Sequence, residues 1–138
     1  MDLDRERERM VDEQLRRRGI ADTRVLAAMG AVPREAFVPE NLRYRAYDDS
    51  ALPIACGQTI SQPFVVASMI AALRLPPEAR VLEVGTGSGY AAAILAEVAG
   101  EVFTVERFAE LANAARERLR AIGYGRVQIH CGDGSLGW

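Results

Sequence analysis

The fold of this 138-residue chain is decided by residues 81–90, which read VLEVGTGSGY. The apolar run at the start of this stretch predicts a buried strand, and it stops where Gly85, Gly87 and Gly89 remove every side chain. A ligand can lie directly against such bare backbone. The alanine-rich residues 90–99 predict a helix whose first N–H groups face that ligand. The stretch therefore predicts a site for a nucleotide-like cofactor.

Two classes of cofactor use a strand, a glycine-rich turn and a helix in this order. A dinucleotide fingerprint counted from Gly85 needs a small residue at Tyr90, although counting from Gly87 gives a match that ends at Ala92. Glu83 precedes the first glycine by two residues, where its charge would repel a pyrophosphate and attract a cation. S-adenosylmethionine carries a sulfonium and an amino group but no phosphate. The motif therefore favours a methyl donor, and a dinucleotide such as NAD stays as the alternative.

Composition and charge indicate a compact domain without a specialised surface. The chain is 49% hydrophobic, which is enough for one core, and its formal net charge of -2 indicates no basic face for nucleic acid. All 17 cationic residues are arginine, which excludes a Schiff-base lysine and a phosphate-loop lysine. No targeting segment and no apolar run of membrane-spanning length is visible, so we expect a cytoplasmic protein without a membrane partner.

The cysteines and the single histidine form no metal-binding pattern. Cys56 and Cys131 lack the spacing of a zinc site, and His130 is the only histidine. We therefore expect no metal, and we expect both cysteines to be buried as small apolar residues.

The chain divides into a helical portion, residues 1–60 including the loop at its end, and an alternating portion, residues 61–138, which we treat together as one domain. The first portion is predicted to hold a helix over 5–18 ended by Gly19, a helix capped by Asp22 or Thr23, and a turn after Pro33 that buries Phe37 and Val38. The second is predicted to hold helices over 62–74, 90–99 and 108–122 and strands over 80–84, 101–106 and 127–131. Such alternation predicts a parallel sheet with right-handed crossovers.

Acidic residues stand at the ends of the second and third strands. Glu106 follows Gly85 by about 20 residues, where a doubly wound fold places an acid that accepts hydrogen bonds from ribose. The alternative is that Glu106 stabilises the N-terminus of the following helix. Asp133 could accept from an adenine amine or could belong to an ordinary Asp-Gly turn. Because the carboxyl ends of parallel strands meet at one edge, three such sites together favour a ligand.

Several segments resemble one family of enzymes. They are VPREAFV (32–38), ALPI (51–54), GQTISQP (57–63), VLEVGTGSGY (81–90) and GDG (132–134). The glycine motif is typical of class I methyltransferases, whereas GQTISQP is specific to protein-L-isoaspartate O-methyltransferases. The resemblance runs from about Met10 to Trp138. It implies an α/β, Rossmann-like class I methyltransferase fold, of which the chain holds N-terminal helices and the first three parallel strands of the doubly wound sheet.

The resemblance also implies an activity, which is methyl transfer from S-adenosylmethionine to the free carboxylate of L-isoaspartyl residues in damaged peptides and proteins. Ser61 would hold the substrate carboxylate with help from Thr59, whereas the local sequence by itself favours Ser61 as a cap of the next helix, and both roles are compatible. The implied donor contacts are Glu83, Gly85, Gly87 and Gly89 for the methionine part, Glu106 for the ribose and Asp133 for the adenine, with Thr86, Ser88 and Gly134 beside them. A carboxylate is already ionised at neutral pH, so no general base is expected.

Two departures from the family pattern qualify these expectations. Ala55 stands where the family usually has glycine and Cys56 lies beside it, so the substrate side is expected to differ in geometry. The chain also stops at Trp138, whereas the family sheet continues in the order 3-2-1-4-5-7-6. One edge of strand 80–84 would then be unpaired, which predicts self-association, aggregation or a fragment of a longer product. A donor-binding but catalytically incomplete fragment and an NAD-dependent oxidoreductase are the alternatives to the repair enzyme.

Overall fold

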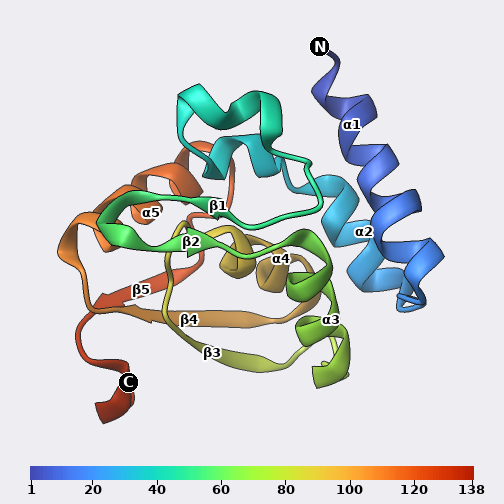
Figure 1. The fold of residues 1–138 in the computed structure, drawn as a ribbon. Helices are drawn as coiled ribbons and strands as arrows, with labels where there is room; N and C mark the ends of the chain where they lie inside the picture. The colour runs from blue at the N-terminus through green and yellow to red at the C-terminus, as the bar shows by residue number, and fades with distance from the viewer.

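Three strands form a parallel sheet in the computed structural model, which describes all residues from 1 to 138. The strands are β3 (Arg80–Val84), β4 (Glu101–Glu106) and β5 (Gln128–Cys131), in the order β3-β4-β5. Leu82 pairs with Phe103, and Phe103 pairs with Gln128 on the other side. The predicted strands and their parallel arrangement are therefore confirmed, and the carboxyl ends of all three strands meet at one edge (Figure 1).

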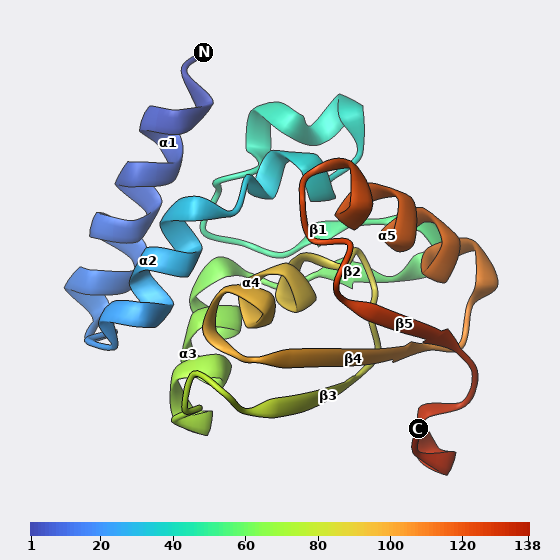
Figure 2. The ribbon, with the colours of Figure 1, turned by 180° about the vertical axis from the view of Figure 1, so that it is seen from behind.

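The two crossover helices cover one face of this sheet. They are α4 (Tyr90–Val98) and α5 (Ala109–Ala121), and Figure 2 shows both on the same side of the strands. Ala92 and Ala93 on α4 and Ala115 on α5 are fully buried, and such small side chains allow close packing. Helices were predicted over nearly the same residues, and the differences of one or two residues at their ends are those usual for frayed helix termini.

The N-terminal helix has the predicted extent but a mixed character. It begins as α1 (Leu3–Arg9), continues as a π-helical segment (Met10–Leu15) and ends as a 3-10 turn (Arg16–Arg18). The π-helical segment brings residues five apart onto one side, and Met10 and Leu15 are both fully buried. Gly19 ends the helix in the left-handed conformation, as expected.

The second predicted helix and the turn after Pro33 are also confirmed. Helix α2 (Thr23–Ala31) is capped by Asp22, whose Oδ1 accepts from the N–H groups of Arg24 (3.0 Å) and Val25 (3.2 Å). The turn is a 3-10 helix (Arg34–Phe37), and Phe37 and Val38 are buried. A further 3-10 helix (Glu40–Arg45) follows it.

A short hairpin precedes the third α-helix, where the sequence indicated only a loop. Its strands, β1 (Leu52–Pro53) and β2 (Thr59–Ile60), pair in antiparallel orientation, and a helical turn (Ala55–Gly57) joins them. Two-residue strands that contain a proline give no periodic signal. Helix α3 (Pro63–Leu73) then begins directly after the hairpin.

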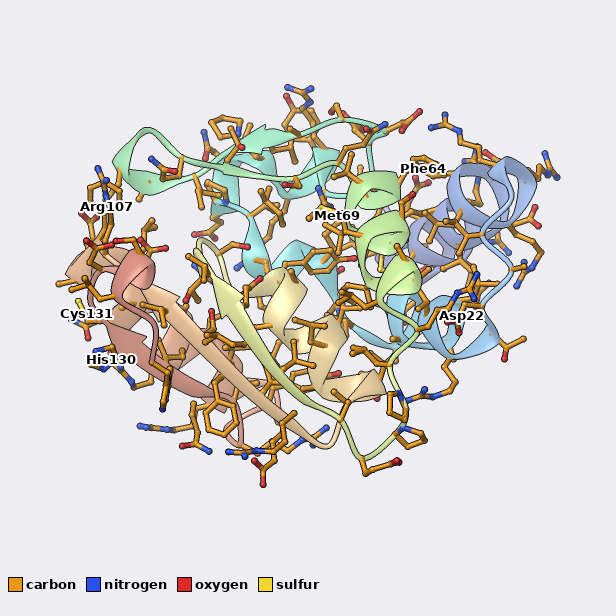
Figure 3. All side chains as sticks on the ribbon, turned by 90° about the horizontal axis from the view of Figure 1, so that it is seen from below. Asp22, Phe64, Met69, Arg107, His130 and Cys131 are labelled. Carbon is orange, nitrogen blue, oxygen red and sulfur yellow. The ribbon has the colours of Figure 1, made fainter.

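Two predictions about burial are wrong. Strand β3 was expected to be buried, but Leu82 is 44% and Val84 is 64% exposed, because helices cover one face of the sheet and β3 forms its edge. Both cysteines were expected to be buried, but Cys56 is half-buried in the hairpin turn and Cys131 is exposed at the end of β5. Figure 3 shows Cys131 at the outer rim of the molecule.

One hydrophobic core joins the helical and the alternating portions. Phe37 from the first portion and Tyr90 from the second contact each other edge to face, with ring centroids 5.5 Å apart. Met29 and Ile94, one from each portion, are fully buried in the same core. None of the helices has the length and apolar character that crossing a membrane requires.

Candidate functional site

The glycine turn after β3 is shaped by hydrogen bonds from the neighbouring strand. The N–H groups of Gly85 and Thr86 both donate to the Val105 carbonyl, at 2.8 and 3.2 Å, so the pairing of β3 with β4 continues into the turn. Gly85 and Gly87 have positive φ values of 92° and 56°, a conformation that favours glycine. The space beside Gly85 is open, because a Cβ built there would meet no atom within 4 Å. The turn thus presents bare backbone, as its sequence predicted.

Glu106 joins this turn to the start of α5. Its Oε1 accepts from the Gly87 N–H at 2.8 Å and its Oε2 accepts from the Phe108 N–H at 3.0 Å. The second bond is the helix-terminal role that the sequence offered as an alternative for Glu106. The carboxylate is almost fully buried, yet it also lines a cavity. Its contribution to the helix is therefore visible, and a contact with ribose stays a prediction.

The candidate site contains two cavities, and the larger of these two lies where the three strands end. It has a volume of about 410 Å³, and it brings together four residues proposed from the sequence, namely Gly85, Glu106, Asp133 and Gly134. Asp133 Oδ1 accepts from the backbone N–H and the hydroxyl of Ser135, and these bonds lower the pKa of the Asp133 carboxyl. The carboxylate is thus an ionised, exposed acceptor at the rim of the cavity. It also caps the short turn Gly134–Leu136, which is the structural alternative.

A smaller cavity adjoins the larger one at Gly85. It has a volume of about 110 Å³. The residues proposed from the sequence that line it are Thr59, Ser61, Glu83, Gly85, Thr86, Gly87 and Ser88. The hairpin and the glycine turn thus face each other across this space. The candidate site therefore has two compartments that meet at one bare glycine.

Glu83 lies at the end of a buried chain of hydroxyl groups. The Thr86 hydroxyl is 2.6 Å from that of Thr104, which donates to Glu83 Oε1 at 2.7 Å. Burial raises the pKa of Glu83 to about 7, and the nearby charge of Glu106 adds to this effect while the Thr104 hydrogen bond opposes it. The second carboxylate oxygen makes no hydrogen bond within the chain. Glu83 can therefore gain or lose a proton near neutral pH and can accept from a ligand.

Ser61 does not cap helix α3. The N-cap residue is Gln62, and no side chain bonds to the first N–H groups of the helix. The Ser61 hydroxyl makes no hydrogen bond within the chain, while the Ser61 carbonyl accepts from Arg34 Nη2 at 2.9 Å. The capping alternative is therefore wrong. The exposed hydroxyl is left free beside the smaller cavity.

Gly89 differs from the other two glycines of the motif. It lines neither compartment and begins α4 at a φ of 93°. A Cβ built on Gly89 would lie 3.4 Å from side-chain atoms of both Ala115 and Leu119 on α5. That spacing is ordinary van der Waals contact, so it is the left-handed backbone that requires glycine here, and a contact between Gly89 and a cofactor stays a prediction.

The larger cavity also contains residues that the sequence did not indicate. Gln58 comes from the hairpin, and Arg107 and Phe108 follow β4 directly. Gln58 gives no local signal, because its place depends on how the hairpin folds over the strand ends. Thr104 could have been suspected, because a hydroxyl within an otherwise apolar buried strand needs a hydrogen-bond partner.

A comparison with protein families identifies the family of the chain. The family model described as "Protein-L-isoaspartate(D-aspartate) O-methyltransferase (PCMT)" matches residues 5–138. The chain belongs to this family. The predicted methyltransferase fold is likewise confirmed, since a solved protein-L-isoaspartate O-methyltransferase structure superposes with a TM-score of 0.80 at 29% identity, over 93% of this chain and 42% of that one.

Relatives from bacteria are similar over nearly the whole chain. Protein-L-isoaspartate O-methyltransferase 1 of Rhodopseudomonas palustris (strain HaA2) is 61% identical over 133 residues, and the enzyme of Synechococcus sp. (strain JA-2-3B'a(2-13)) is 58% identical over 133 residues. Each match covers 96% of this chain and 54% of the relative. A Plasmodium falciparum structure solved in complex with S-adenosyl-L-homocysteine has a TM-score of 0.74 at 24% identity, over 91% of this chain and 62% of that one, which supports the fold alone. The chain thus spans about half the length of its curated relatives.

The raised pKa of Glu83 predicts a pH-dependent stability. Between the ordinary pKa of about 4.5 and the folded value of about 7, the folded state keeps a proton that the unfolded state loses, so stability falls as the pH rises. Glu83→Gln carries no such charge. The free energy of unfolding of the unsubstituted chain should therefore fall relative to that of E83Q by up to about 3 kcal/mol between pH ~4.5 and ~8.

Urea denaturation over this pH range measures the difference in the free energy of unfolding between the unsubstituted chain and E83Q. Glu78→Gln is the control, because Glu78 is an exposed carboxylate. A gap between the unsubstituted chain and E83Q that stays constant across the range would contradict the burial of a carboxylate at Glu83.

Proposed function

We propose that this chain forms the donor-binding and substrate-orienting part of an S-adenosylmethionine-dependent protein-L-isoaspartate O-methyltransferase. Residues 1–60 and 61–138 would act as one domain. The observation that carries the proposal is the meeting of two compartments at Gly85, one lined by Glu106 and Asp133 and the other by Ser61. Membership in the family supports the same conclusion.

The charges around the site favour a cationic donor over a pyrophosphate. Glu83, Glu106 and Asp133 are all acidic, and Arg107 is the only cationic residue that lines either compartment. A pyrophosphate would meet like charges here, whereas an ammonium or sulfonium group would be attracted. The free oxygen of Glu83 could accept from an amino group, and the open face of Gly85 leaves room for a ligand against the backbone. These features fit S-adenosylmethionine better than NAD.

The reaction depends mainly on the alignment of the carboxylate oxygen with the methyl carbon and the sulfur of the donor. Bound S-adenosylmethionine would supply an electrophilic methyl group, and transfer forms a bond from carboxylate oxygen to carbon while the carbon–sulfur bond breaks and sulfur keeps the electron pair. No proton moves, so the site needs no general base. The Ser61 hydroxyl would donate a hydrogen bond to the substrate carboxylate and fix its direction, with the exposed Thr59 hydroxyl beside it. Such positioning can lower a barrier by roughly 7 to 11 kcal/mol in favourable cases.

Ser61→Ala should separate substrate orientation from donor binding. We expect labelled methyl transfer to an isoaspartyl peptide to fall about tenfold or more, because one hydrogen bond in the transition state is worth about 1.4 kcal/mol or more. The affinity for S-adenosylhomocysteine, measured by calorimetry, should change less than about twofold. Ser68→Ala is the control, because Ser68 lies on α3 and lines neither compartment. Transfer is measured in this chain and in a chimera that joins it to the remaining part of the R. palustris relative.

The outcomes distinguish the candidate functions. Equal methylation of matched isoaspartyl and aspartyl peptides would contradict the repair assignment. Binding of S-adenosylhomocysteine without transfer, in the folded chimera as well, would support a donor-binding module. Binding of NAD in place of S-adenosylhomocysteine would support an oxidoreductase.

We also propose that the 138-residue chain by itself associates through the edge of β3. The edge has no paired neighbour, and a cavity of about 430 Å³ separates it from apolar residues of α3. On the two sides of this cavity, Leu82, Val84, Met69 and Leu73 are all exposed. Figure 3 shows Met69 on α3 beside the strand. An exposed apolar edge of this kind is suited to pairing with a second copy.

The average mass from light scattering should therefore increase with the concentration of the unsubstituted chain. Leu82→Lys should move the equilibrium to the monomer, because it places a charge on the edge strand. Leu136→Lys is the control, because Leu136 is exposed outside the strands. A monodisperse monomer of the unsubstituted chain at about millimolar concentration would exclude the association.

A further inference from the structure

A buried guanidinium group lies behind the Ser61 segment. Arg34 is fully buried, and it is the largest of the fully buried side chains. Its Nε donates to the Ala46 carbonyl at 2.7 Å and its Nη2 donates to the Ser61 carbonyl at 2.9 Å. The guanidinium carbon lies 4.9 Å from the centroid of the Tyr90 ring, and Nη1 has no hydrogen-bond partner. Its direct contacts are thus carbonyl oxygens and an aromatic face.

Burial of the Arg34 guanidinium group costs free energy. A buried cation without a carboxylate partner loses several kcal/mol of hydration, and burial accordingly lowers the pKa of Arg34. An apolar side chain of similar length could fill the same volume without that penalty. What an apolar side chain cannot do is donate hydrogen bonds to the Ala46 and Ser61 carbonyls at the same time, which the rigid guanidinium fork does. The contribution of Arg34 is therefore to fix the positions of these two carbonyl groups.

The hydrogen bond from Arg34 affects the direction of the Ser61 side chain. Ser61 lies between β2 and the first residue of α3, and its hydroxyl makes no hydrogen bond that could orient it. The bond from Arg34 to its carbonyl restrains the peptide plane that follows Ser61. This restraint limits the backbone angles of Ser61 and hence where its hydroxyl points.

Arg34 is itself held by the N-terminal helices. Its backbone N–H donates to the Tyr47 hydroxyl at 3.1 Å, and Arg7 Nη1 donates to the same oxygen at 3.2 Å. The Tyr47 hydroxyl in turn donates to Glu35, and Gln14 donates to the Tyr47 carbonyl at 2.7 Å. The helical portion is thus connected through Arg34 to the segment that carries Ser61.

We propose that Arg34 is a positioning residue of the methyl-transfer site, which holds the Ser61 carbonyl so that the Ser61 hydroxyl faces the smaller cavity. The role in transfer rests on the proposed function, whereas the restraint on Ser61 does not. Arg34 would then act on turnover only through Ser61. It lines neither cavity, so the contacts proposed for the donor should stay unchanged.

A double-mutant cycle in the chimera described above tests the role in transfer. Arg34→Met should lower kcat for the isoaspartyl peptide about tenfold, with S-adenosylhomocysteine affinity within about twofold of the unsubstituted value. In a Ser61→Ala background the same change should lower kcat less than about twofold, because the group that it orients is gone. Arg24→Met is the control, since Arg24 also donates to two carbonyls, of Leu75 and Val98, and lines neither cavity. Full additivity of the Arg34 and Ser61 effects would overturn the proposal.

A second measurement needs no activity. In the 138-residue chain, Arg34→Met should shift the backbone NMR resonances of Ser61 and Gln62 while those of Gly85 and Gly87 stay in place. Arg34→Lys, which keeps the charge, serves the same comparison if the methionine variant does not fold. Unchanged Ser61 and Gln62 resonances in a folded variant would refute the restraint. If these resonances shift but no form of the enzyme transfers methyl groups, the restraint stands and the proposed function fails.

Discussion

The end of strand β4 controls the shape of the whole candidate site. The Val105 carbonyl accepts two N–H groups of the glycine turn, and the Glu106 carboxylate accepts a third from Gly87 and a fourth from the start of α5. Successive N–H groups in a left-handed bend have no partner within their own strand, so these acceptors stabilise the bend. The bonds thus fix the backbone of the turn that contains Gly85, where both compartments meet.

Much of this arrangement could be predicted from local sequence patterns. Apolar runs and alanine-rich segments place β3, α4 and β4, and a parallel register then brings Glu106 beside Gly87 even though they are far apart in the sequence. Asp133 reaches the same edge because it follows β5. The prediction succeeds for these residues because each position depends on one element and one register. The role of Glu106 at the start of α5 could be expected in advance, since an acid at a helix start has its own physical reason, whereas its bond to the Gly87 N–H could not.

Other features could not be predicted, because they depend on contacts between distant segments. The hairpin from Leu52 to Ile60 has strands of two residues, which leave no periodicity. The hydrogen bond from Arg34 to Ser61 exists because α1, the turn after Pro33 and the hairpin pack together. The burial of β3 was misjudged because the apolar pattern of a strand shows what it can bury and not what covers it. Gly89 is equivalent to Gly85 in the motif, but in the structure it lines neither cavity and forms the N-cap of α4.

The most direct test of the account is an NMR titration of the 138-residue chain with S-adenosylhomocysteine and, separately, with NAD. We expect saturable shifts of the backbone amides of Gly85, Gly87 and Gly134 with S-adenosylhomocysteine and none with NAD. Shifts of these amides with NAD alone, or a response to S-adenosylhomocysteine confined to another part of the chain, would contradict the claim that the bend after β3 binds a methyl donor.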